Sequence, residues 1–272
     1  MNPFSRLMKS AGSQPPLGCW VMSASAIVVE AMGHAGFDWG VIDMEHTPLE
    51  MMGVMHMLQA VGNTRMLPVV RVPWNDAVMV KRVLDAGATT VLFPMVQDAD
   101  EARRAVAATR FPPEGVRGIA AMSRASRFGT TPNYLQTANQ QIGVIVQIES
   151  AAAVAQIEAI AAVPGIDALF VGPADLAGSL GLPGETTHAK VLSLIAEAVQ
   201  RAKAVGKPIG TLALTQDAAT RYRAMAFDYL AVAADLSLVM QGAAATLRAL
   251  RTQDGSGHVH TLNRGTQTDA TP

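Results

Sequence analysis

Several short apolar runs in this chain end abruptly in charged or polar residues. Four of them, at residues 41–46, 67–71, 144–149 and 168–175, end in His46, Arg71, Glu149 and Asp175. A lone charge is costly to bury, so such residues normally lie where strands open onto a solvated cleft. In parallel α/β proteins this cleft lies at the carboxyl ends of the strands. The pattern therefore predicts an active site at that end of a sheet.

The spacing of apolar residues predicts eight strands and eight helices in strict alternation. Strands are expected near residues 17–22, 40–45, 67–72, 90–95, 143–149, 168–172, 207–213 and 228–233. Helical patterns cover about 26–35, 50–61, 76–86, 98–109, 150–162, 188–205, 215–225 and 235–250, with Asn75 or Asp76 as the N-cap of the third. Eight such units predict an α/β fold, a single (β/α)8 barrel closed by right-handed crossovers.

Two connections are longer than the others and follow the fourth and sixth strands, at residues 110–141 and 176–188. Long loops at this end of a barrel usually build or cover the site. The barrel domain is expected to span residues 1–252. The polar segment 253–272 has no apolar period, so we expect a disordered tail there.

Composition favours small-molecule chemistry in the cytoplasm. Half of the 272 residues are hydrophobic, and the formal net charge of -1 gives no electrostatic footprint for nucleic acid or an anionic membrane. No stretch approaches the roughly 18 apolar residues that span a bilayer. The single cysteine, Cys19, excludes an intrachain disulfide and is expected to be a small core residue.

Glu149 and Asp175 each end an apolar run, and the two strands follow one another in the predicted barrel. Two carboxylates that converge at one rim suit a hard divalent cation, with water and ligand oxygens filling the other positions. Helix N-caps or salt bridges at the rim are the structural alternative.

His46 follows Glu45 at the mouth of the second strand, with Asp43 three residues before it. Since side chains alternate along a strand, Asp43 and Glu45 are expected to share one face. A histidine oriented by a carboxylate is a candidate general base.

Arg71 is expected to place its guanidinium inside the barrel mouth, where it can polarise a carbonyl or bind a carboxylate. An ion pair with Asp43, Glu45 or Asp85 is a structural alternative that does not exclude this role. The small residues 172–174 would let backbone amides approach a substrate carboxylate.

Asp85 ends a predicted helix just before Gly87, where the helix dipole disfavours a negative charge. That end of a barrel helix is remote from its own active site. If Asp85 takes part in catalysis, it is expected to act across a subunit interface.

The chain has no GxSxG, Walker, HExxH or first-strand GxGxxG motif. None of its five lysines ends an apolar strand, which disfavours a Schiff-base aldolase. Metal-assisted enolisation of a 2-oxo acid needs the groups that remain, namely a Lewis acid, a base and a cationic clamp.

Over about residues 16–250 the chain closely resembles the class II pyruvate aldolases of the HpcH/HpaI family. The resemblance is carried by residues 36–39, 42–46, 70–76, 93–97, 110–118, 146–149 and 171–176. It implies metal binding by Glu149 and Asp175, and pyruvate contacts from Gln147 and the Ala174 region, with Asp175 and Arg71 beside them. One departure is His188-Ala189, where relatives often have His-Pro.

The resemblance also implies catalytic roles for four residues. His46 would transfer a proton, Arg71 would stabilise the transition state, Asp85 would enhance the basicity of the histidine, and Asp43 would be its additional acidic neighbour. The family is typically hexameric, with the final helix exchanged between subunits.

The resulting hypothesis is a homo-hexameric aldolase that depends on Mg²⁺, Mn²⁺ or Co²⁺ and reversibly cleaves a 4-hydroxy-2-oxo acid to pyruvate and an aldehyde. The closest substrate is 4-hydroxy-2-oxoheptanedioate, a dicarboxylate from aromatic degradation. A 2-dehydro-3-deoxy sugar-acid aldolase, a macrophomate synthase-like decarboxylating enzyme and a non-catalytic 2-oxo acid binder remain alternatives.

Overall fold

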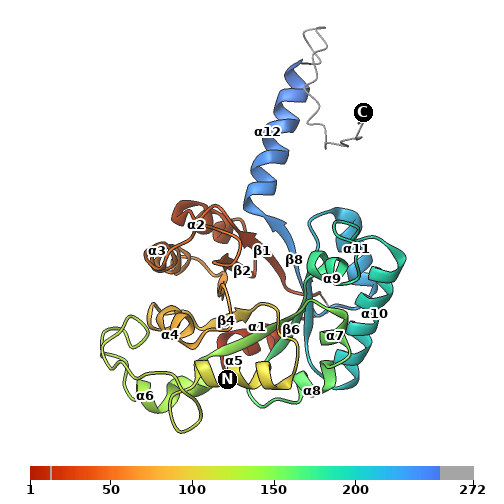
Figure 1. Ribbon diagram of the computed structural model, residues 1–272. Coiled ribbons are helices and arrows are strands. Elements are labelled where there is room, and N and C mark those ends of the chain that lie inside the picture. Colours follow the sequence, from red (N-terminus) through yellow and green to blue (C-terminus); the bar gives the residue numbers. More distant parts are fainter. Residues whose placement is uncertain (13, 252–272) are drawn as a thin grey trace, which may run out of the picture. The chain divides into compact units, whose positions relative to one another are not determined.

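The computed structural model describes residues 1–12 and 14–251, and within them eight parallel strands close into a barrel (Figure 1). The strands are β1 (Leu17–Val21), β2 (Trp39–Asp43), β3 (Leu67–Arg71), β4 (Thr90–Phe93), β5 (Gly143–Ile148), β6 (Ala168–Val171), β7 (Ile209–Leu212) and β8 (Tyr229–Ala234). Each strand pairs with the next, and β8 pairs with β1. The predicted (β/α)8 barrel is confirmed.

Helices alternate with these strands in the described residues. They are α1 (Pro3–Ser10), α2 (Ala26–His34), α3 (Met51–Val61), α4 (Ala77–Asp85), α5 (Ala99–Thr109), α6 (Tyr134–Thr137), α7 (Ala151–Val154), α8 (Ile157–Ala161), α9 (Pro173–Ser179), α10 (Ala189–Ala204), α11 (Gln216–Ala224) and α12 (Asp235–Arg251), with the 3₁₀ helix η1 (Ala138–Gln141). The helix predicted at 150–162 is divided into α7 and α8, and α9 extends into the segment 176–188, which was predicted as a loop. The N-cap of α4 is Asp76, whose side chain accepts from the Met79 amide at 2.8 Å.

The first helix, α1, was not predicted, and it covers the amino-terminal end of the barrel. Its Phe4 is fully buried, with its ring centroid 5.2 Å from that of Tyr229. Asn2 caps the helix by accepting from the Ser5 amide, and its side-chain amide donates to Asp167, just before β6, at 2.8 Å. These contacts fix α1 at the end opposite the predicted site.

The inside of the barrel is a packed aromatic core. Trp39 lies with its ring centroid 5.5 Å from that of Tyr229 and 6.4 Å from that of Phe170. The indole occupies space that only a glycine leaves open, because a Cβ at Gly18 on the neighbouring strand would lie 2.2 Å from the Trp39 ring. Side chains therefore fill the lower barrel, and only its upper end can hold a ligand.

A second apolar layer lies between the strands and the surrounding helices. Cys19 belongs to it, fully buried with its Sγ 3.8 Å from Sδ of Met66. Burial, with the negative charge of Asp235, raises the pKa of the thiol to about 12. The thiol stays protonated at neutral pH, so Cys19 is a core residue, as predicted.

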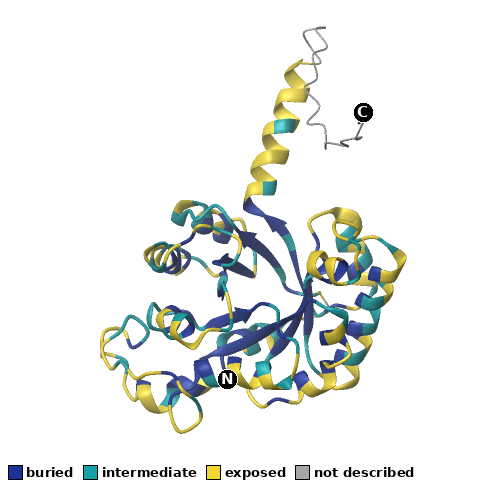
Figure 2. Cartoon of the chain, viewed as in Figure 1, coloured by how far each residue is buried: buried dark blue, intermediate teal, exposed yellow. Residues whose placement is uncertain are grey.

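The chain divides into two compact units, Met1–Leu236 and Ser237–Pro272. In the second unit, the described part of α12 is largely exposed (Figure 2) and includes the exposed apolar residues Leu238, Val239, Met240, Leu247 and Leu250. The tail predicted from residue 253 lies outside the described residues. Within residues 1–12 and 14–251, no helix has the length and apolar character needed to cross a membrane.

Candidate active site

A cavity of about 770 Å³ opens at the carboxyl ends of the strands. This volume is typical of sites for small molecules. Six of the predicted site residues line it, namely His46, Arg71, Gln147, Glu149, Ala174 and Asp175. Asp43 is fully buried at the end of β2 and contacts Arg71, whereas Asp85 does not line the cavity.

Arg71 is held by two carboxylates. Asp43 lies opposite it in the register of β2 and β3 and accepts from Nε at 2.8 Å and from Nη2 at 2.7 Å. Nη1 lies 2.6 Å from Oε2 of Glu45, an ion pair without hydrogen-bond geometry. The guanidinium also lies over the ring of Trp20, 5.0 Å from its centroid. These contacts fix the plane of the guanidinium while leaving it some of its five N–H donors.

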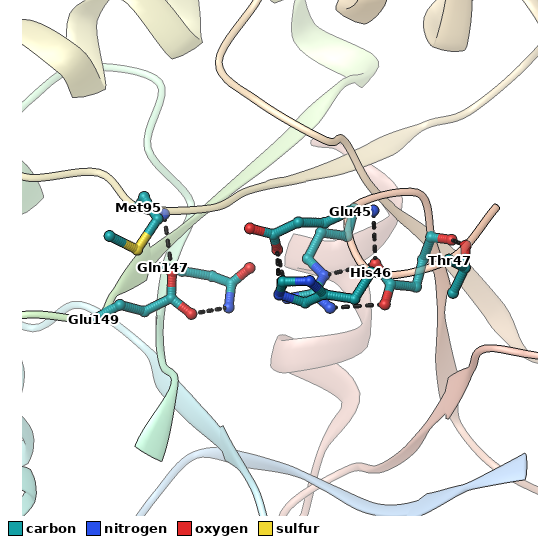
Figure 3. Close-up of polar contacts among 8 residues, drawn as sticks. Glu45, His46, Thr47, Met95, Gln147 and Glu149 are labelled. Atoms are coloured by element: carbon teal, nitrogen blue, oxygen red, sulfur yellow. Dashed lines mark hydrogen bonds and ion pairs between the residues drawn. The ribbon is translucent and has the colours of Figure 1, made fainter. Parts of the chain in front are cut away.

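The carboxylate beside His46 is that of Glu45, not that of Asp43. Nε2 of the exposed His46 lies 3.9 Å from Oε2 of Glu45. Asp43 binds Arg71 and accepts from the Glu45 amide at 3.0 Å, an interaction that begins a turn directly after β2. This turn brings the Glu45 side chain beside His46 (Figure 3), and Oε2 of Glu45 also lies 2.6 Å from Nη1 of Arg71. The structure therefore places Asp43 against Arg71, where the resemblance had implied a neighbour of His46.

Gln147 and Glu149 project from the end of β5 as a hydrogen-bonded pair. The two residues are two positions apart, so they share the inner face of the barrel. Nε2 of Gln147 donates to Oε1 of Glu149 at 2.7 Å, and the Met95 amide donates to Oε2 at 2.9 Å (Figure 3). Oε1 of Gln147 is buried and has no hydrogen-bond partner among the described residues. A ligand with a donor group or a cation would satisfy it.

Burial raises the pKa of Glu149 to about 7, although the hydrogen bond from the Met95 amide lowers it. The negative charges of Asp175 and Glu45 raise it further, and Arg71 lowers it. Burial is also the main cause of the raised pKa of Glu45. The site therefore concentrates more negative charge than Arg71 alone offsets.

Asp175 and Ala174 lie in the first turn of α9, and both are exposed to the cavity. Gly172, the N-cap of α9, has no side chain, and a Cβ there would lie 2.3 Å from Oε1 of Glu149. This glycine therefore makes room for the carboxylate of Glu149. The sequence analysis predicted that small residues here let a substrate approach the backbone. The structure shows that Gly172 also leaves space for the carboxylate of Glu149.

The donor set fits a divalent cation that keeps most of its coordination sphere for water and ligand. The described residues contain no group of three or more His, Cys, Asp or Glu side chains that could hold a metal ion. Glu149 and Asp175 thus offer two carboxylates at most, which is the pattern of Mg²⁺-type sites. Each carboxylate has about four lone-pair sites, so the two hydrogen bonds that Glu149 accepts leave it able to coordinate.

Asp85 lies away from these residues, at the last position of α4. Its carboxylate accepts from Nη2 of the buried Arg117 at 2.8 Å. Arg117 in turn donates to the Tyr134 hydroxyl at 3.2 Å and lies over the Phe111 ring. A single chain does not bring Asp85 to the cavity, in agreement with the expectation that it is remote from its own site.

Two groups in the site were not among the predicted site residues. Glu45 was expected only to share a face with Asp43 and to be a possible ion-pair partner of Arg71, and the structure shows that ion pair. The Met95 amide carries no signal in the sequence, because any residue supplies a backbone N–H.

The family model described as HpcH/HpaI aldolase/citrate lyase matches residues 16–242. The chain belongs to this family. A 2-dehydro-3,6-dideoxy-6-sulfogluconate aldolase of Pseudomonas putida is 46% identical over 87% of this chain and 92% of its own length. A 4-hydroxy-2-oxo-heptane-1,7-dioate aldolase of Salmonella heidelberg is 43% identical over 90% of this chain and 92% of its own.

Comparison with solved structures supports the same family assignment. A crystal structure of an HpcH/HpaI aldolase/citrate lyase family protein from Burkholderia cenocepacia has a TM-score of 0.88 and 42% identity, covering 92% of this chain and all of its own. With aldolases of this family at 43–46% identity, this HpcH/HpaI protein is a carbon–carbon lyase.

Proposed function

We propose that this protein is a divalent-metal-dependent aldolase that reversibly cleaves a 4-hydroxy-2-oxo acid to pyruvate and an aldehyde. The observation that carries this assignment is the placement of Glu149, Gln147 and Arg71 around one cavity, with Asp175 beside them. Glu149 and Asp175 would hold Mg²⁺, Mn²⁺ or Co²⁺. When bound, such a cation acts as a Lewis acid toward the 2-oxo group.

The other side chains of the site would bind pyruvate and stabilise the enolate. Gln147 donates one amide N–H to Glu149 and keeps its second N–H for an oxygen of pyruvate. The residues from Gly172 to Ala174 lack bulky side chains, so the pyruvate carboxylate can approach the backbone there. Arg71, fixed by Asp43 and Glu45, offers its remaining N–H donors to the oxygen of the forming enolate.

His46 is the candidate base for the aldol proton. It is exposed at the cavity mouth beside Glu45 and carries no hydrogen bond that would block its ring nitrogens among the described residues. In cleavage, the ring takes the proton of the 4-hydroxyl as the bond between C3 and C4 breaks and its electron pair moves into the enolate. In condensation, the ring returns the proton to the new hydroxyl.

Two substrate classes have specific support. The relative from Salmonella heidelberg supports 4-hydroxy-2-oxoheptanedioate, whose aldehyde is succinic semialdehyde. The relative from Pseudomonas putida supports a 2-dehydro-3-deoxy sugar acid or a sulfonated analogue. Condensation of pyruvate with succinic semialdehyde and with hydroxylated aldehydes, compared by kcat/KM, distinguishes the two. Decarboxylation of oxaloacetate without any condensation product would favour the macrophomate synthase-like alternative.

We further propose a homo-hexamer in which α12 is exchanged between subunits. The exposed apolar residues of α12, among them Val239 and Leu250, support association of chains. Light scattering coupled to size exclusion tests this, and a monomer at micromolar concentration would contradict it.

A further inference from the structure

On the basis of the proposed aldolase function, we propose that Arg221 recognises an oxyanionic group at the far end of the aldehyde. Arg221 lies on α11 and lines the same cavity as Arg71 and Glu149. It would make the enzyme selective for acceptors that end in a carboxylate or a sulfonate. No sequence motif singles it out, since it is one of two arginines in the last turn of α11.

The cavity has a wall that the chemistry at Glu149 and Arg71 does not use. This wall is formed by the end of β7 and by α11, and it includes Leu212, Leu214, Ala218 and Tyr222. At about 770 Å³ the cavity is much larger than pyruvate requires. The second wall therefore has room for the aldehyde half of the substrate, and its mostly apolar side chains suit an alkyl chain.

Arg221 is the basic group on this wall, and the described residues offer it no partner. Its side chain is half-buried, and its guanidinium forms no hydrogen bond or ion pair with any residue that the structure describes. Asp217 lines the cavity one helical turn earlier but forms no ion pair with it. By contrast, the buried Arg71 and Arg117 are both paired with carboxylates. A half-buried guanidinium beside apolar side chains gains most from a ligand that supplies the missing anion.

The other end of the cavity offers no free cation for a second anion. A divalent cation bound there would be offset by the carboxylates of Glu149 and Asp175 and would take the pyruvate half of the substrate. Arg71, the other arginine in the described lining, contacts Asp43 and Glu45, and its remaining donors are assigned to the enolate oxygen. Arg221 is therefore the cation in the described lining that is available to a distal carboxylate. The planar fork of Arg221 matches carboxylate and sulfonate oxygens.

The test compares two acceptors of equal chain length, succinic semialdehyde and butanal, in condensation with pyruvate. The readout is the ratio of kcat/KM for the charged acceptor to that for the neutral one. Arg221→Gln should lower this ratio by about 10- to 100-fold, the usual effect of losing a hydrogen bond to a charged group. Arg221→Lys should retain part of the preference, because it keeps the charge but loses the fork.

Arg223→Gln is the matched control, since Arg223 is exposed on the same helix and does not line this cavity. It should keep the ratio of the wild type. If folded Arg221→Gln keeps the wild-type ratio, Arg221 does not recognise the distal group, and the proposed aldolase function is unaffected. The same conclusion follows if Arg221→Gln and Arg223→Gln lower the ratio equally. If the wild-type protein fails to condense pyruvate with any of the aldehydes, the proposed function is wrong, and this inference with it.

Discussion

Asp43 and Arg71 lie opposite each other on neighbouring strands and meet at two points, with N–O distances of 2.8 and 2.7 Å. Because the pair is buried at the strand ends, it fixes a guanidinium at the floor of the cavity. Glu45 approaches the third nitrogen of the group from the following turn. The position of Arg71 therefore depends on the planar, forked shape of the guanidinium as well as on its charge.

Replacing Arg71 with Lys should lower kcat for cleavage by about 10²-fold or more, the effect of losing one oxyanion donor. Lysine keeps the positive charge but cannot contact Asp43 at two points and also reach Glu45. The measurement is steady-state pyruvate release, with circular dichroism to establish folding and Arg223→Lys as the control. Turnover near that of the wild type would show that Arg71 serves only the structure.

Replacing His46 with Ala should lower cleavage by about 10²- to 10⁴-fold, the usual contribution of a general base. Pyruvate should still inhibit with a similar constant, because the contacts proposed for it lie with Arg71, Gln147 and the α9 turn. Both quantities are measured on the same preparations. If pyruvate inhibition is lost together with cleavage, His46 organises the substrate rather than moving the proton. If neither changes, the base is another group.

Replacing Gly172 with Ala should weaken divalent-cation binding by about 10- to 100-fold, the range for disturbing the support of a metal ligand. The added Cβ would lie 2.3 Å from Oε1 of Glu149, so the carboxylate must move. Isothermal titration with Mn²⁺ measures the effect. Gly178→Ala is the matched control, since no atom lies within 4 Å of a Cβ at that glycine of the same helix. Equal affinities in the two variants would contradict the account of Gly172.

Without metal, the protein should lose stability as the pH rises toward neutrality. Burial raises the pKa of Glu149 from 4.5 to about 7 in the folded state. A carboxyl group whose pKa is higher when folded contributes stability that is fully present below 4.5 and lost as the pH passes through about 7. Urea unfolding in chelator at pH 5 and pH 7.5, for wild type and Glu149→Gln, measures this contribution.

Glu149→Gln should lack this part of the pH dependence of the unfolding free energy. For a pKa shift of this size, the contribution is on the order of 1–3 kcal/mol. Added Mg²⁺ should restore the stability of the wild type at the higher pH, because a cation favours the ionised carboxylate. Parallel pH profiles for wild type and variant would show that Glu149 is not the group responsible.

The barrel could be predicted because buried parallel strands require continuous apolar runs, and the polar residues that end those runs stand out. His46, Arg71, Glu149 and Asp175 were found in this way, and all four line one cavity. Asp175 was predicted to end the apolar run of the sixth strand, but it lies in the first turn of α9. A seven-residue helix that begins with Pro173 and contains Gly178 is too short to display a helical period.

Other features depend on distance in space and leave no local pattern. The turn after Asp43 turns the Glu45 side chain toward Arg71, which strand alternation alone does not specify. Helix α1 lies outside the alternation of strands and helices, and its role appears only when Phe4 packs on Tyr229. Arg221 resembles a solvated residue in the sequence, and its relevance depends on the cavity that α11 helps to form.

The most direct test of this account is cleavage of 4-hydroxy-2-oxoheptanedioate before and after complete removal of metal. Pyruvate release is followed by a coupled assay, and residual metal is quantified by elemental analysis. The account predicts that chelation abolishes cleavage and that Mg²⁺, Mn²⁺ or Co²⁺ restores it, with no restoration in Glu149→Gln. Full activity in protein shown to be metal-free would contradict the central claim that Glu149 and Asp175 hold a catalytic cation.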